Sequence, residues 1–279
     1  MAEKDIPEPD TRKMPTGIAS LDPVMEGGVP PGSVILLLAE IGAGSAEFIY
    51  SSVLSLSRLS KTEKAAKDLV LPGSIRYITV TRRNEDIRRE ISLSFHPDLA
   101  NSLDTVQFED LSMVYFDSTV VPIDWYSKGD VMTRLQNRTS RDMLAYLSEI
   151  LKSGTQNSLV VLDSFTDLAT QAVSKGRWDE LMAYMRGLQR VSKQWNTTIY
   201  LPLTRGILDV RNEREIADIV DAVILFKWEE SAAARRQRIM YCEKFRGLMP
   251  HLEERDLVKF AVRISSATGF EVSNIRVVV

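Results

Sequence analysis

The 279-residue chain has a single cysteine, Cys242, and only two histidines, His96 and His251. One thiol cannot form a disulfide within the chain, and three such residues are too few for a Cys/His zinc site. Near the amino terminus the longest apolar run, Val34–Ala39, has six residues, whereas a membrane-spanning helix needs about 20. We therefore predict no metal site and no membrane partner, and we expect a cytoplasmic protein.

Positive charge is not in excess either. Thirty-five lysines and arginines face 38 aspartates and glutamates, which gives a formal net charge of −3. Proteins that bind nucleic acid through its phosphates usually carry a basic surface. A nucleic-acid partner is therefore disfavoured for the chain as a whole, although a local basic patch is not excluded.

Apolar strand-like runs alternate with amphipathic stretches of helical period, which favours an α/β fold with a mainly parallel sheet. Three later strand-like segments follow one another without helices (239–243, 257–264 and 270–272), and they predict an antiparallel extension at the carboxyl terminus. We expect one domain over residues 15–279 after a mobile tail over residues 1–14. The expected strands are 34–39, 76–80, 159–162, 197–203 and 222–227, and the expected helices are 47–59, 84–95, 138–152 and 178–195; the less regular stretch 105–129 contains two β-type segments, at 106–108 and 113–116.

A glycine-bearing loop follows the first apolar run and opens a helix, which is the setting of a phosphate-binding loop with the motif G-x-x-x-x-G-K-S/T. Aligned on its second glycine, the loop has serine for the motif lysine and alanine for the metal-binding Ser/Thr. The segment reads Ala39-Glu40-Ile41-Gly42-Ala43-Gly44-Ser45-Ala46-Glu47. The Glu47 carboxylate would occupy the positive end of the helix dipole that a phosphate would use. By itself the loop fits an ordinary glycine turn equally well.

Several further segments carry a resemblance to the RecA-superfamily ATPases of the KaiC and archaeal RadA-like type. It extends over residues 15 to 272 and implies a RecA-like P-loop NTPase fold, with a mainly parallel central sheet flanked by helices. The segments are Thr16-Gly17-Ile18-Ala19-Ser20-Leu21-Asp22, Gly27-Gly28-Val29-Pro30-Pro31-Gly32-Ser33, Val160-Val161-Leu162-Asp163-Ser164, Ala217-Asp218-Ile219-Val220-Asp221-Ala222-Val223-Ile224 and Lys244-Phe245-Arg246-Gly247.

The resemblance implies roles for particular residues. Asp163 ends the strand that is similar to the Walker B strand, where it would hold Mg²⁺ through water; as an isolated signal, an Asp after a strand is more often a cap. The two glutamates that polarise the attacking water in the family are replaced by Thr81 and Arg82. Lys244 and Arg246 match residues that reach a neighbouring subunit's γ-phosphate, which predicts a homo-oligomer or a ring with paralogues. The alternative is a basic pair on an exposed strand.

Two loops that bind DNA in RecA-like recombinases correspond to 172–178 and 204–214. The first carries Lys175 and Arg177, but the charges of the second nearly cancel. The densest basic run, residues 235–238, is expected at a solvent-facing hairpin tip. Neither observation favours a DNA-binding surface over an ordinary solvent-exposed one.

The missing lysine, hydroxyl and glutamates predict a degenerate nucleotide site (Gly42 to Glu47, with Asp163) and no catalytic residue. We therefore expect a non-hydrolysing regulatory or scaffolding protein with an unknown protein partner. No cofactor is required by this interpretation, although ATP or ADP with Mg²⁺ remains an option. Two alternatives stay open: an ATP-binding protein or weak ATPase in which Arg82 or Arg83 replaces the lysine, and an accessory factor in DNA recombination or repair.

Overall fold

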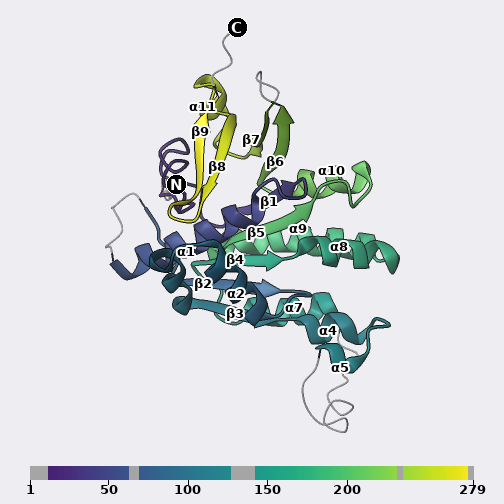
Figure 1. Cartoon of the computed structure of the whole chain (residues 1–279). Coiled ribbons are helices and arrows are strands. Elements are labelled where there is room, and N and C mark those ends of the chain that lie inside the picture. The colour runs from purple at the N-terminus through teal and green to yellow at the C-terminus, as the bar shows by residue number, and fades with distance from the viewer. Residues whose placement is uncertain (1–11, 63–68, 127–141, 231–234, 276–279) are drawn as a thin grey trace, which may run out of the picture.

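A computed structural model of the chain describes residues 12–62, 69–126, 142–230 and 235–275. Within these residues the strands form one nine-stranded sheet in the order β3-β2-β4-β5-β1-β6-β7-β8-β9 (Figure 1). The strands are β1 Val34–Ala39, β2 Ser74–Thr79, β3 Val106–Asp110, β4 Ser158–Asp163, β5 Thr198–Thr204, β6 Ala222–Glu230, β7 Arg236–Phe245, β8 Lys259–Ser265 and β9 Gly269–Asn274.

The sheet changes from parallel to antiparallel at β6. All pairs from β3 to β6 are parallel, and β6 to β9 pair antiparallel. In Figure 1 these last strands, coloured green to yellow, extend the sheet beyond β1. The predicted α/β fold and its antiparallel carboxyl-terminal extension are confirmed.

Helices cover both faces of the parallel strands, which explains why β1 is apolar throughout. Ile35 and Leu37 belong to the core under α1, and Val34 and Leu36 belong to the core on the opposite face. The main helices are α1 Ser45–Thr62 and α2 Asn84–Ser94 on the first face, and α7 Met143–Lys152, α8 Phe165–Ser174, α9 Trp178–Trp195 and α10 Val210–Ile219 on the second.

Short helical segments join these elements: α3 Pro97–Ala100, the 3₁₀ turn η1 Asn101–Thr105, α4 Ser112–Asp117, α5 Ile123–Tyr126 and α11 Met249–Glu254. One of them corrects the sequence analysis, because residues 113–116 were expected as a β-type segment and lie in α4. A four-residue apolar run cannot distinguish strand from helix. At the start of this helix the Asp110 carboxylate accepts the backbone N–H of Ser112 (2.8 Å).

Two predicted boundaries fall partly outside the described ranges. Of the tail expected over residues 1–14, residues 1–11 lie outside, but Lys13 pairs with Leu69 and the buried Met14 pairs with Val29. Residues 138–141 of an expected helix also lie outside; the described part begins at the cap Asp142, whose side chain accepts the Ala145 N–H (3.0 Å). In the described part of the chain, no helix is long and apolar enough to cross a membrane.

Candidate functional site

The glycine loop connects β1 to α1 at the carboxyl edge of the parallel strands. Gly42 and Gly44 both have positive φ angles, +72° and +109°. A Cβ on Gly42 would meet nothing within 4 Å, whereas a Cβ on Gly44 would lie 3.2 Å from Ile264 of β8 and 3.4 Å from Phe270 of β9. The loop is therefore packed against the carboxyl-terminal strands at Gly44 and open at Gly42.

Two side chains of the β6–β7 pair bind this loop. The indole N–H of Trp228 donates to the carbonyl of Ile41 (3.1 Å), and Nε of Arg238 donates to the carbonyl of Gly42 (3.0 Å). The backbone N–H of Trp228 also donates to Glu40 (3.0 Å). The expectation of a solvent-facing tip at 235–238 agrees with the exposure of Arg235 and Arg236. It is wrong for Arg238, which lies opposite Trp228 on β7 and contacts the loop.

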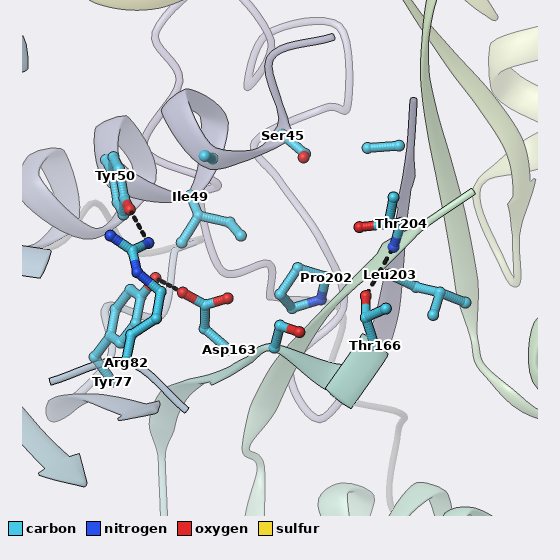
Figure 2. A pocket seen from close by; sticks show the side chains of 13 residues that line it. Ser45, Ile49, Tyr50, Tyr77, Arg82, Asp163, Thr166, Pro202, Leu203 and Thr204 are labelled. Carbon is cyan, nitrogen blue, oxygen red and sulfur yellow. Dashed lines mark hydrogen bonds between the residues drawn. The ribbon is translucent and has the colours of Figure 1, made fainter. Parts of the chain in front are cut away.

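A cavity of about 150 Å³ lies beside the loop, between the start of α1 and the ends of β2, β4 and β5. Figure 2 shows it from close by. It brings together four residues that the sequence analysis singled out: Ser45, Ala46, Arg82 and Asp163 line it. Glu47, in the first turn of α1, is not among its lining residues, so it does not block this cavity.

Asp163, at the end of β4, is bound by a tyrosine. The hydroxyl of Tyr77 donates to its carboxylate (2.6 Å), as Figure 2 shows. Burial raises the pKa of Asp163 above its ordinary value, against the opposite effect of the Tyr77 hydrogen bond. Burial also raises the pKa of Tyr77, so this hydroxyl stays protonated and serves as a donor.

The raised pKa of Asp163 makes folding stability depend on pH. The folded state holds this proton more tightly than the unfolded state, so the stabilisation is present below the ordinary pKa of 3.8 and is lost as the pH rises to the folded-state value. We expect Asp163→Asn to gain stability relative to the wild type between pH 4 and pH 7. Thermal unfolding of both proteins at the two pH values measures this, and an unchanged difference in melting temperature would contradict it.

Arg82 is held by α1 and α2. Its guanidinium donates to the Tyr50 hydroxyl (3.2 Å) and forms an ion pair with Glu90, and the Tyr50 hydroxyl donates to Glu90 (3.1 Å). The adjacent Arg83 pairs with Asp86 (2.8 Å). Both arginines that could have replaced the missing lysine are therefore neutralised by a carboxylate of α2.

The second replaced catalytic position, Thr81, faces a different carboxylate. Its hydroxyl donates to Asp167 (2.9 Å), which also accepts from Ser164 (3.1 Å). At the neighbouring strand end, the Thr204 N–H donates to the Thr166 hydroxyl (2.9 Å; Figure 2). The polar groups along this edge thus bind one another.

Lys244 and Arg246 lie at the opposite edge of the sheet, beside the start of β6, where Lys244 pairs with Val223. Lys244 donates to the carbonyls of Ala217 and Asp218 (2.8 and 2.7 Å), and Arg246 also donates to Asp218 (3.1 Å). These cations cap the carboxyl terminus of α10, where positive charge is favourable. They cannot reach the cavity of their own chain.

Sequence analysis missed Tyr50, Tyr77, Glu90 and Trp228 as site residues, and it placed Arg238 at a hairpin tip and not at the loop. Tyr50 lies one helical turn after Ala46, which is a usable signal because residues four apart share a helix face. The other residues contact partners far away in the sequence, so no local sequence pattern indicated their part in the site.

The mainly parallel sheet, with the β1–α1 loop at its carboxyl edge and antiparallel strands after β6, is a KaiC-like RecA fold. In particular, the structure is similar to the crystal structure of a KaiC-like protein from the hyperthermophilic archaeon Pyrococcus horikoshii, with a TM-score of 0.61 and 17% sequence identity. The match covers 94% of this chain and 99% of that chain. No family model matches the sequence, and no curated protein matches it.

Proposed function

We propose that this chain is a KaiC/RadA-like protein with a degenerate nucleotide site, which acts as a non-hydrolysing regulatory or scaffolding protein. One observation carries the proposal. The cavity beside the glycine loop has Arg82, paired with Glu90, where the family has a catalytic glutamate, and Ala46 where it has a metal-binding hydroxyl.

No residue at the two positions of the family's glutamates, Thr81 and Arg82, could act as a base for the attacking water. Arg82 has only N–H donors and stays protonated. Glu90 accepts from both Arg82 and Tyr50, and Asp167 accepts from two hydroxyls. Neither residue at the family's glutamate positions, Thr81 or Arg82, is a carboxylate, so the site lacks a general base where the family has one, which supports a function without hydrolysis.

The residues also fit Mg²⁺ poorly. Mg²⁺ prefers oxygen ligands, with one or two carboxylates and nucleotide phosphates, but Ala46 supplies no side-chain oxygen, and one oxygen of Asp163 already accepts from Tyr77. The cavity of about 150 Å³ is also smaller than the roughly 300–1,000 Å³ of typical small-molecule sites.

A scaffolding role requires assembly. Lys244 and Arg246 lie at the edge of the sheet opposite the cavity, and a head-to-tail arrangement of copies or paralogues would bring such opposite edges together. We therefore retain a homo-oligomer or a mixed ring as part of the proposal.

Phosphate release from ATP tests the function. We expect purified wild-type protein with ATP and Mg²⁺ to release no more phosphate than the buffer does. The matched control is Asp163→Asn, which should equal the wild type. Hydrolysis that depends on Mg²⁺ and disappears in Asp163→Asn would overturn the proposal and favour the weak-ATPase alternative.

The accessory role in DNA recombination gains no support from the two stretches that correspond to DNA-binding loops. Arg177 pairs with Glu180 and Asp142, and Arg205 pairs with Glu40 (3.4 Å). Residues 172–174 also belong to α8 and residues 210–214 to α10, so both segments are partly helical.

A further inference from the structure

The glycine loop is bound by its own carboxyl-terminal strands. Two consecutive loop carbonyls, those of Ile41 and Gly42, accept hydrogen bonds from Trp228 and Arg238. These partners lie opposite each other on β6 and β7, and the Arg238 guanidinium stacks on the Trp228 ring at 4.5 Å. The two donors therefore form one unit that meets the loop from the side of the antiparallel strands.

Two further contacts support this unit. Arg236 stacks on the Trp228 ring at 4.1 Å, and the Arg238 stem lies 3.5 Å from the position that a Gly44 Cβ would take. Within the described ranges, no carboxylate forms an ion pair with Arg238, in contrast to Arg82 and Arg83. Its charge is therefore directed to a carbonyl and an aromatic face, both of which attract cations.

Glycine-rich loops need such a constraint. Fixing each residue's backbone costs about 1–2 kcal/mol, and glycine loses the most freedom. In an intact phosphate-binding loop, the phosphates of the ligand accept hydrogen bonds from the backbone N–H groups and so hold the loop in place. Here the constraint comes from within the chain and acts on the carbonyls.

We propose that Trp228 and Arg238 form an intramolecular clamp that orders the glycine loop without a nucleotide and couples it to the antiparallel strands. The clamp goes beyond the proposed function, because it concerns what shapes the loop and not whether ATP is hydrolysed. Movement of the loop requires that Arg238 leave the Gly42 carbonyl.

Hydrogen–deuterium exchange of full-length protein, followed in peptides that cover residues 40–48, tests the clamp. We expect exchange to accelerate about tenfold in Arg238→Met and about fivefold in Trp228→Phe, from the loss of one charged and one neutral hydrogen bond. Phenylalanine keeps an aromatic ring for stacking and removes only the indole donor. Exchange in β4 should stay unchanged in both variants, which would show that the fold is intact.

Arg236→Met is the matched control, because Arg236 stacks on the same ring but makes no hydrogen bond to the loop. It should exchange like the wild type. Equal acceleration in all three variants, or in none, overturns the clamp. So does a wild-type loop that exchanges about tenfold more slowly once ATP is added, since the nucleotide would then supply the missing order. Phosphate release with the expected exchange pattern would overturn only the non-hydrolysing function.

Discussion

Replacing Phe48 by alanine should lower the free energy of unfolding by about 3–5 kcal/mol, the usual loss for a fully buried phenylalanine. Phe48 is 1% exposed and lies one turn after the glycine loop, where its N–H donates to the Gly44 carbonyl. Its ring contacts those of Tyr200, Phe226 and Phe270, with centroids 5.9, 5.5 and 5.3 Å away. The side chain thus joins α1 to β5, β6 and β9.

Urea unfolding monitored by circular dichroism measures this loss. The matched control is Phe116→Ala on α4, whose ring is half-buried and belongs to neither core. We expect that control to lose about 1 kcal/mol or less. Equal losses in the two variants would show that the α1 face of the sheet is not anchored at Phe48.

Local patterns were sufficient to predict the elements that position the site. The helix Trp178–Trp195 and the strand Val34–Ala39 were predicted with the bounds that the structure has, because each has a strong period or a continuous apolar run. Two of the longer helices, α8 and α10, were missed. The sequence around α10 carries mixed charges that resemble a loop, and the helix forms because Ile216 and Ile219 are buried beneath it.

The contacts that define the site could not be predicted from local patterns. Arg238 and Gly42 are 196 positions apart, and Tyr77 and Asp163 are 86 apart. Only the order of the strands brings such residues together, because β2 pairs with β4 and β7 lies two strands from β1. The same limit applies to Arg82: its charge was visible in the sequence, but its neutralisation by Glu90 depends on how α2 packs.

Replacing Asp221 by alanine is expected to produce the second-largest loss of stability, about 2–4 kcal/mol, because a buried N–H loses a charged acceptor. Asp221 is 4% exposed and precedes β6. Its carboxylate accepts the Val34 N–H (2.9 Å) and the Gln189 side chain (2.8 Å), and it forms ion pairs with Lys193 and, at 3.7 Å, with Arg246. It therefore ties β1 to β6 at the edge opposite the cavity.

Arg246→Ala is the control for Asp221→Ala. The Arg246 side chain is half-exposed and lies 3.7 Å from the Asp221 carboxylate, so we expect its removal to cost only about 0–1 kcal/mol. Urea unfolding of both variants measures the two losses in the free energy of unfolding. Similar losses would mean that Arg246 itself stabilises the folded subunit. A large loss for Asp221→Ala alone would leave Arg246 dispensable within the subunit. A drop in molar mass of Arg246→Ala by light scattering would then assign this cation to contact between copies, as the proposed assembly requires.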